Sequence, residues 1–99
     1  MLFPVEIFRV RENSMLPAIK PGDYVIINTL CHKFFRPARG DIIVLKHPHN
    51  DLIIIKRVKS ISKNGKLFVA GDNKRASEDS RKFGPVNLKD VIGKVVITI

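Results

Sequence analysis

The chain has 99 residues, of which 44% are hydrophobic, and it carries a formal net charge of +9 and a single cysteine. This length and composition fit one globular domain, residues 1–99, and exclude a disordered chain. No run reaches the ~18 apolar residues that a membrane-spanning helix requires, and residues 1–6 are too few and too charged for a signal peptide. We therefore expect a cytoplasmic protein, or at most one held peripherally at a membrane.

The positive charge favours acidic partners such as nucleic acid, anionic lipid or an acidic protein. The basic residues are dispersed along the chain, however, and the few aromatic residues do not alternate with them as in single-strand binders. We therefore interpret most of this charge as solvated surface and expect no nucleic acid partner. Cys31 has no second cysteine to pair with and is interpreted as a partly buried thiol, which suits a reducing compartment.

Six segments rich in β-branched and aromatic residues are typical of strands. They are residues 5–10, 24–28, 41–46, 52–61, 66–70 and 90–99. Turn residues separate them, among them Pro21-Gly22-Asp23 and Asn64-Gly65, the latter predicting a hairpin with a type I′ turn. Residues 71–85 are polar and loop-like, and Gly93 is a candidate bulge in the last strand. The sequence thus predicts a small all-β domain of antiparallel strands.

Ser14 follows the first predicted strand, in the segment Asn13-Ser14-Met15-Leu16-Pro17. The simplest interpretation is an N-cap that opens a short helical turn. A serine can also act as a nucleophile, but it then needs a base as its partner. None of His32, His47 and His49 lies in an obvious catalytic setting, and no further ligand stands at a metal-binding spacing from them.

Lys56 is the better candidate for that base, because it lies within the apolar segment 52–58. A lysine among apolar side chains can lose its proton near neutral pH, and serine–lysine pairs are an established catalytic arrangement. Strand alternation places Lys56 on the face of Ile54 and Val58. The opposite face is also partly apolar, so the alternative that Lys56 extends to water at a sheet edge stays open.

Four blocks occur in a fixed order along the chain: Ser14-Met15-Leu16-Pro17, Arg39-Gly40-Asp41, Lys56-Arg57-Val58 and the loop from Gly71 to Arg81. Together they resemble the type I signal peptidase family of serine–lysine endopeptidases, over about residues 10–95. The resemblance implies the all-β catalytic core of that family. The large inserted β-domain is not expected, since only a short turn at residues 62–65 separates the strands that would flank it.

The resemblance also implies the catalytic roles. Ser14 matches the nucleophile, Lys56 the general base, and Ser77 the loop serine that hydrogen-bonds and orients the lysine. The Ser14 N–H would be one donor to the oxyanion of the intermediate. Many members carry Ser or Gly two residues before the nucleophile, where a second donor can stand. That position is Glu12 here, and a carboxylate is a poor neighbour for an oxyanion.

Four further positions match supporting residues of the family. Asp79 and Arg81 match an ion pair that holds the loop beside the active site. Met15 and Pro17 match positions that shape the turn around the nucleophile. The chemistry needs neither cofactor nor metal.

The small size, the expected absence of a membrane anchor and the loop ending Phe83-Gly84-Pro85-Val86 are similar to the nickel-type superoxide dismutase maturation proteases. This resemblance implies a precursor protein whose N-terminal leader is removed, with small residues such as Ala one and three positions before the cleaved bond. One alternative is a minimal signal peptidase that acts at a membrane surface. Another is a basic β-domain without catalysis that binds nucleic acid or peptides.

Overall fold

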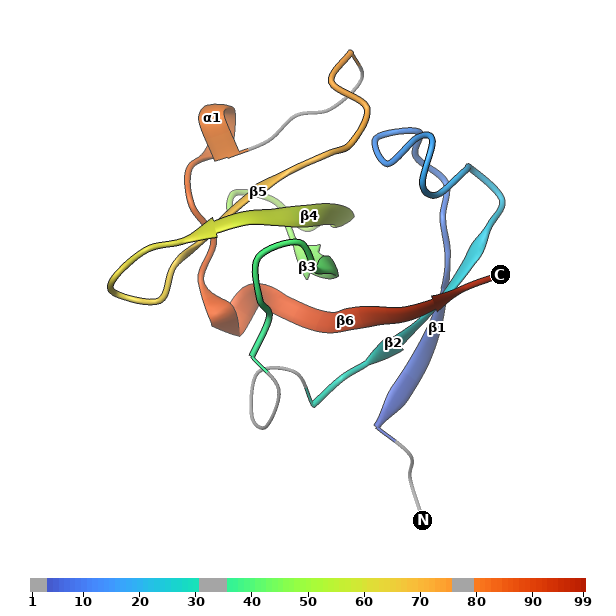
Figure 1. Ribbon diagram of the computed structural model, residues 1–99, viewed down its shortest axis with the longest axis horizontal. Coiled ribbons are helices and arrows are strands. Elements are labelled where there is room, and N and C mark those ends of the chain that lie inside the picture. Colours follow the sequence, from blue (N-terminus) through green and yellow to red (C-terminus); the bar gives the residue numbers. More distant parts are fainter. Residues whose placement is uncertain (1–3, 31–35, 76–79) are drawn as a thin grey trace.

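The computed structural model describes residues 4–30, 36–75 and 80–99, and their strands form a single antiparallel sheet (Figure 1). The strands are β1 (Val5–Arg9), β2 (Tyr24–Asn28), β3 (Ile42–Lys46), β4 (Ile53–Ile61), β5 (Leu67–Ala70) and β6 (Val91–Thr98). Their order in the sheet is β1-β2-β6-β3-β4-β5. The all-β prediction is confirmed, and each predicted strand lies within one residue of its expected bounds. The helix α1 (Ser80–Phe83) and the 3-10 turn η1 (Leu88–Asp90) lie in stretches where no helix was predicted.

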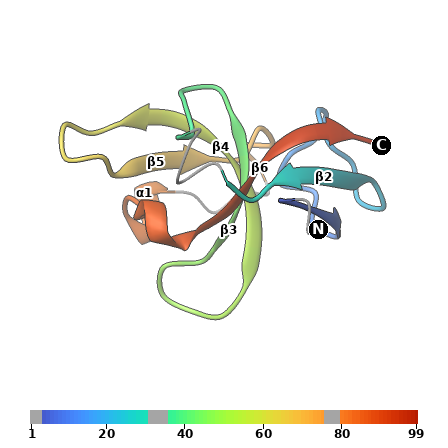
Figure 2. The same ribbon diagram turned by 90° about the horizontal axis from the view of Figure 1, so that it is seen from below.

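Buried apolar side chains form two clusters on opposite faces of β3 and β4, because successive residues of a strand point to opposite faces. The first cluster consists of Ile43, Leu45, Ile54, Val58, Leu67, Val69, Phe83, Val86 and Val91. The second cluster consists of Val10, Met15, Ile19, Val25, Ile27, Val44 and Ile55. The two central strands are therefore covered on both faces, which explains why their sequences are almost continuously apolar. Figure 2 shows β3 and β4 between β5 with α1 on one side and β1 with β2 on the other.

The outer strands β1 and β2 are covered on one face only. Their inward side chains join the second cluster. On the opposite face, Ile7 of β1 is paired with Ile26 of β2, and Ile26 is paired with Ile97 of β6. Ile7 is 65% exposed and Ile97 is 53% exposed. We call this exposed apolar surface, formed by Val5, Ile7, Tyr24, Ile97 and Ile99, the open face.

The strand β6 joins the two halves of the sheet, and it does so with two irregularities. Its register shifts once against β3 and once against β2. Gly93 lies beside the first shift, and a Cβ there would come within 2.8 Å of both the Asn28 carbonyl oxygen and Ile27 Cδ1. Glycine is therefore required by the close approach of β2, in agreement with the bulge predicted near Gly93.

The hairpin between β4 and β5 differs from its prediction. Gly65 has a positive φ of 83°, but within the described residues no other residue type has a positive φ, so Asn64 does not adopt the type I′ conformation. The Gly65 N–H instead donates to the Ser62 carbonyl at 2.9 Å. This geometry is that of a type I turn followed by a glycine in the left-handed region, the usual solution for longer hairpin loops.

Among the residues that the structure describes, no helix is both long and apolar enough to cross a membrane.

Candidate active site

Ser14 lies in the loop between β1 and β2. Backbone hydrogen bonds join the two ends of this loop, and Met15 packs into the core. The Val10 N–H donates to the Asp23 carbonyl at 2.8 Å, and the Gly22 N–H donates to the Val10 carbonyl at 2.7 Å. Met15 is fully buried in the second cluster. It thus anchors the turn from inside. Pro17 is exposed and follows a cis peptide bond.

The side chain of Ser14 points to β4 and does not cap a helix. Its hydroxyl donates to the Ile55 carbonyl at 3.4 Å, and Ser14 is only 1% exposed. Within the described part of the chain, no helix begins at this turn, so the N-cap interpretation is wrong. The contact places the serine hydroxyl against the backbone of the residue that directly precedes Lys56.

Lys56 is buried in the middle of β4, with 3% of its surface exposed. It is paired with Ile43 of β3, and its neighbours on the same face, Ile54 and Val58, belong to the first cluster. The alternative in which this lysine extends to water at a sheet edge is therefore wrong. Both faces of the strand are covered around it, and its side chain lies in the interior.

The loop after β5 holds the Ser14 turn through two hydrogen bonds of Asn73. Its backbone N–H donates to the Ser14 carbonyl at 2.8 Å, and its side-chain amide donates to the Asn13 carbonyl at 3.0 Å. In contrast, none of the hydrogen bonds within the described residues uses the Ser14 N–H. A buried N–H without a protein acceptor is rare and is a ready donor to a bound ligand.

The same loop is fixed to β4 by an ion pair that sequence reasoning did not identify. Arg57 donates from Nε and Nη2 to the two carboxylate oxygens of Asp72, each at 2.8 Å, and from Nη1 to the Gly40 carbonyl at 2.8 Å. The hydrogen bonds with Asp72 raise the pKa of Arg57, and those with Arg57 lower the pKa of Asp72 below its ordinary value of 3.8. Arg57 follows Lys56 and Asp72 precedes Asn73, so this pair joins the lysine strand to the loop that holds Ser14. Both residues lie in the blocks that carry the resemblance, which was the only signal available.

The structure describes only one of the three predicted site residues in the loop after β5. Ser77 and Asp79 lie outside the described residues, so the bond from Ser77 to Lys56 and the pair between Asp79 and Arg81 stay predictions. Arg81 is exposed on α1. The next residues of this segment are structural, because Phe83 and Val86 are buried in the first cluster. The ending Phe-Gly-Pro-Val thus has a packing role in this chain.

The two histidines of the turn between β3 and β4 are engaged in hydrogen bonds. The His49 N–H donates to Nδ1 of His47 at 3.1 Å, and the His49 ring lies 2.8 Å from the Phe83 carbonyl. The described residues contain no group of three or more histidine, cysteine, aspartate or glutamate residues that could hold a metal ion.

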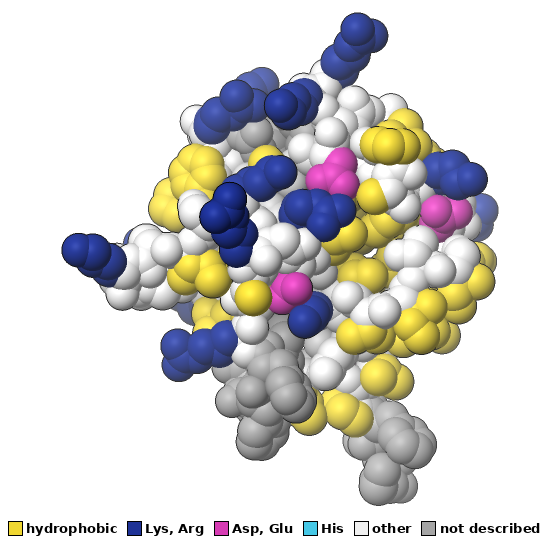
Figure 3. Space-filling model, viewed as in Figure 1, with side chains coloured by type: hydrophobic (Ala, Val, Ile, Leu, Met, Phe, Trp, Pro, Cys, Tyr) yellow, Lys and Arg dark blue, Asp and Glu magenta, His cyan; other side chains and the backbone are white. Residues whose placement is uncertain are grey.

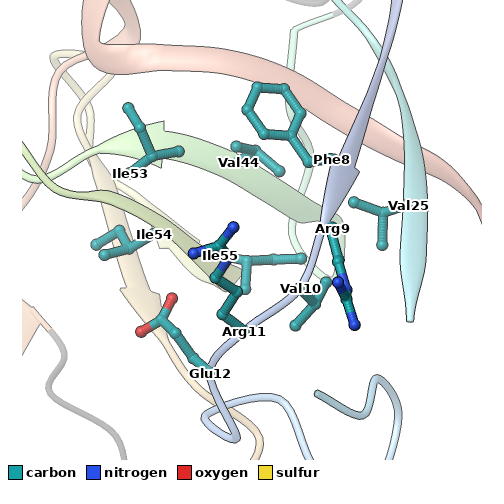
Figure 4. A pocket seen from close by; sticks show the side chains of 10 residues that line it. All are labelled: Phe8, Arg9, Val10, Arg11, Glu12, Val25, Val44, Ile53, Ile54 and Ile55. Carbon is teal, nitrogen blue, oxygen red and sulfur yellow. The ribbon is translucent and has the colours of Figure 1, made fainter. Parts of the chain in front are cut away.

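An apolar pocket of about 220 Å³ opens beside the Ser14 turn (Figure 4). Its apolar side chains come from four strands and the start of the turn: Phe8, Val10, Val25, Val44 and Ile55. Arg11 and Glu12 stand at its edge, between the end of β1 and β4. Glu12 also lines a neighbouring hollow of about 240 Å³ together with Lys56 and His47. The pocket can accept a small apolar side chain, and Glu12 lines both this pocket and the hollow that contains Lys56.

These features define a small all-β domain in which a buried serine adjoins a strand that carries a buried lysine, beside an apolar pocket. The chain matches the model of the family "Signal peptidase, peptidase S26" over residues 1–62 and 59–99, and it belongs to this family.

Three relatives illustrate the similarity. "Mitochondrial ATP-independent inner membrane protease subunit 1b" of Arabidopsis thaliana is 32% identical over 84% of this chain and 63% of its own length. "Signal peptidase I V" of Bacillus subtilis (strain 168) is 25% identical over 89% of this chain and 82% of its own length. "Mitochondrial inner membrane protease subunit 2" of Mus musculus is 36% identical over 81% of this chain and 58% of its own length. The match to the two mitochondrial relatives thus covers about three fifths of their length.

Proposed function

We propose that the chain is a serine endopeptidase that removes an N-terminal leader from a precursor protein, with Ser14 as the nucleophile and Lys56 as the general base. The observation that carries this proposal is the contact of 3.4 Å from Ser14 Oγ to the Ile55 carbonyl, which places the hydroxyl against the backbone of the residue that precedes the buried Lys56. Membership of the signal peptidase family supports the same reaction class.

The proposed reaction begins with a neutral Lys56, which takes the proton of the Ser14 hydroxyl as the oxygen attacks the peptide carbonyl. The Ser14 N–H donates to the oxyanion that forms. Lys56 then gives its proton to the leaving amine, and an acyl-enzyme remains. In the second half, Lys56 takes a proton from water, the hydroxide attacks the ester, and the proton returns to Ser14 as the acid product leaves.

Burial supports the role of Lys56 as a base. Removing an ammonium group from water disfavours its charged form, so we expect the pKa of Lys56 to lie below the ~10.4 of a solvated lysine. Activity should then rise with pH along one ionisation well below that value. An activity limb at the solvated lysine value would contradict the buried base.

The decisive test uses a leader peptide with Ala one and three positions before the cleaved bond, together with the variants Ser14→Ala, Lys56→Ala and Lys56→Arg. Each variant should lower the cleavage rate by about 10³-fold or more, because the groups act as a unit and a guanidinium stays protonated. Circular dichroism should show that the variants are folded. Appreciable cleavage by folded Ser14→Ala would refute the assignment.

For the specific substrate we propose the N-terminal leader of a nickel superoxide dismutase precursor. The support is the resemblance of the loop ending, and the apolar pocket suits the small residue that the resemblance implies three positions before the bond. The purified chain should cut that precursor without detergent, and mass spectrometry should read a single new N-terminus.

The open face favours a second candidate, a peptidase of the same chemistry that acts at a membrane surface. Ile7, Ile97 and Ile99 are exposed there, and an exposed apolar surface of this kind is a common mark of contact with lipid or protein. Flotation with liposomes separates the two candidates. Cleavage of a membrane-inserted preprotein, with the dismutase precursor left intact, would select the second one.

A further inference from the structure

A second and larger hollow adjoins the Ser14 turn through Pro17. It has a volume of about 480 Å³, and we call it the basic hollow because three of its lining residues are cations: Lys59, Lys74 and Arg81. Pro17, Phe68 and Asp72 also line it. It shares no lining residue with the apolar pocket.

Among the described lining residues of the basic hollow, Asp72 is the one with a carboxylate, and that carboxylate is already engaged. Asp72 forms two hydrogen bonds with Arg57, and within the described residues it forms no ion pair with Lys59 or Lys74. Lys59 and Lys74 are exposed, and in the described part of the chain neither side chain forms an ion pair or a hydrogen bond. Figure 3 shows Lys and Arg side chains gathered over β4, β5 and α1, while hydrophobic side chains gather on the side of β1 and β2.

The path of β4 relates the basic hollow to the serine. Ile53 to Ile55 line the apolar pocket, Lys56 follows, and Lys59 lines the basic hollow. Lys59 stands three residues beyond Lys56, which is roughly 10 Å at ~3.3 Å per strand residue. The hollow also adjoins the serine turn, because Pro17 lines it and Asn73, next to Asp72, bonds the Ser14 carbonyl. An extended peptide that runs along β4 from the apolar pocket past Lys56 therefore reaches this hollow.

We propose that the basic hollow binds an acidic segment of the precursor on the carboxyl-terminal side of the cleaved bond, with Asp or Glu about two to four residues after it. This inference rests on the proposed function, which assigns the apolar pocket to the residues before the bond. Carboxylates complement the cations of Lys59 and Lys74 and strengthen the encounter through long-range attraction. A peptide fits better than nucleic acid, since Phe68 is the one aromatic residue among the described residues that line the hollow, and single strands need several stacking surfaces.

The test compares three peptides that share Ala one and three positions before the bond and differ only two to four positions after it, where they carry Glu, Gln or Lys. Cleavage is measured with the unaltered chain as kcat/KM. Binding of the uncut peptides is measured with Ser14→Ala by fluorescence anisotropy at low and high salt. We expect the Glu peptide to be favoured over the Gln peptide by about five- to twentyfold at low salt, and the preference to fade at high salt.

Two double variants test whether the preference for the Glu peptide depends on the cations of the basic hollow. Lys59→Gln with Lys74→Gln should abolish the preference for Glu, because it removes two cations of the basic hollow. Lys66→Gln with Lys82→Gln removes the same charge from exposed positions outside the hollow and should keep the preference. A peptide with Glu placed only before the bond should show no gain.

Each outcome separates this inference from the proposed function. Equal cleavage of all three peptides overturns the acidic segment and leaves the peptidase intact. No cleavage, together with Glu-selective binding that Lys59→Gln with Lys74→Gln abolishes, refutes the peptidase and supports the acidic ligand. In a third outcome, the chain binds a single-stranded oligonucleotide, the same double variant abolishes that binding, and the Glu peptide is not preferred over the Gln peptide. This result overturns the inference in favour of nucleic acid.

Discussion

The two halves of the sheet differ in how many of their faces are covered. In β3 and β4 alternate residues belong to the first and second clusters, so both faces are buried. In β1 and β2 only the inward face packs, and Ile7 on the outward face is 65% exposed. A lysine side chain can be held inside only in the half with two covered faces, and Lys56 lies there. The comparison shows that the local setting of the candidate base comes from the layering of the sheet.

The largest difference between the halves should appear in the free energy of unfolding. Ile43→Ala removes a fully buried side chain from the doubly covered half and should cost about 2–5 kcal/mol. Ile97→Ala on the open face should cost less than about 0.5 kcal/mol. Urea unfolding with unchanged m-values measures both. Equal losses at the two positions would contradict the comparison.

A smaller loss is expected where the halves meet. Gly93→Ala places a Cβ 2.8 Å from the Asn28 carbonyl oxygen and from Ile27 Cδ1, and should destabilise the protein by about 1–3 kcal/mol. Val96→Ala in the same strand is the control, because Val96 is exposed and should have little effect. If Gly93→Ala were as mild as this control, the close approach of β2 to β6 would be disproved.

The ion pair of Arg57 with Asp72 should contribute about 1–2 kcal/mol, because both side chains are partly exposed. The pKa of Asp72 is lower in the folded state, so its contribution is complete above the ordinary value of 3.8 and is lost as the pH falls through the lowered value. Asp72→Asn should therefore lower stability at pH 7 and flatten the acid limb of stability against pH. Asp51→Asn, at an exposed position, is the control. An unchanged acid limb in Asp72→Asn would contradict the pair.

A small effect on stability is expected at Lys56 itself. Lys56→Met keeps the volume and replaces a buried amine with an apolar group, so the free energy of unfolding should fall by less than about 1 kcal/mol or even rise. Peptide cleavage should nevertheless drop to background, whereas Lys66→Met at an exposed position should leave it unchanged. A loss of several kcal/mol in Lys56→Met would show that the lysine is chiefly a structural residue.

Much of the fold followed from the sequence because the strands are marked by local signals. Residues 24–28, for example, are predicted and observed as a strand with the same bounds. The turn at Asn64 was assigned wrongly, because Asn-Gly suits two turn types and the loop length decides between them. The helix α1 was missed, since it consists of four residues and its Phe83 is held by contacts with the core.

The sequence predicted those features of the candidate site that depend on residues close together in the chain, and it did not predict contacts between residues far apart. The alternation of β4 left the burial of Lys56 open, because both faces are partly apolar and only the tertiary packing covers them. The pairing of Arg57 with Asp72 joins residues 15 positions apart and has no local signature. The hydrogen bond from Ser14 to the Ile55 carbonyl spans 41 positions and was not predicted, whereas the pairing of Ser14 with Lys56 was proposed from the apolar context of the lysine and from the resemblance.

The position of β6 in the middle of the sheet has a consequence for synthesis. Among the described residues, the hairpin of β1 and β2 around Ser14 is joined within the sheet to β3 and β4, the strand of Lys56, through residues 91–98 alone. A nascent chain that lacks these residues can form the hairpin of β1 with β2 and that of β3 with β4, but it cannot align them as one sheet. Pairing of such distant segments is slow compared with local contacts. The proposed protease would thus acquire its activity only after the ribosome has released β6, and unfinished chains would pose no proteolytic hazard to their surroundings.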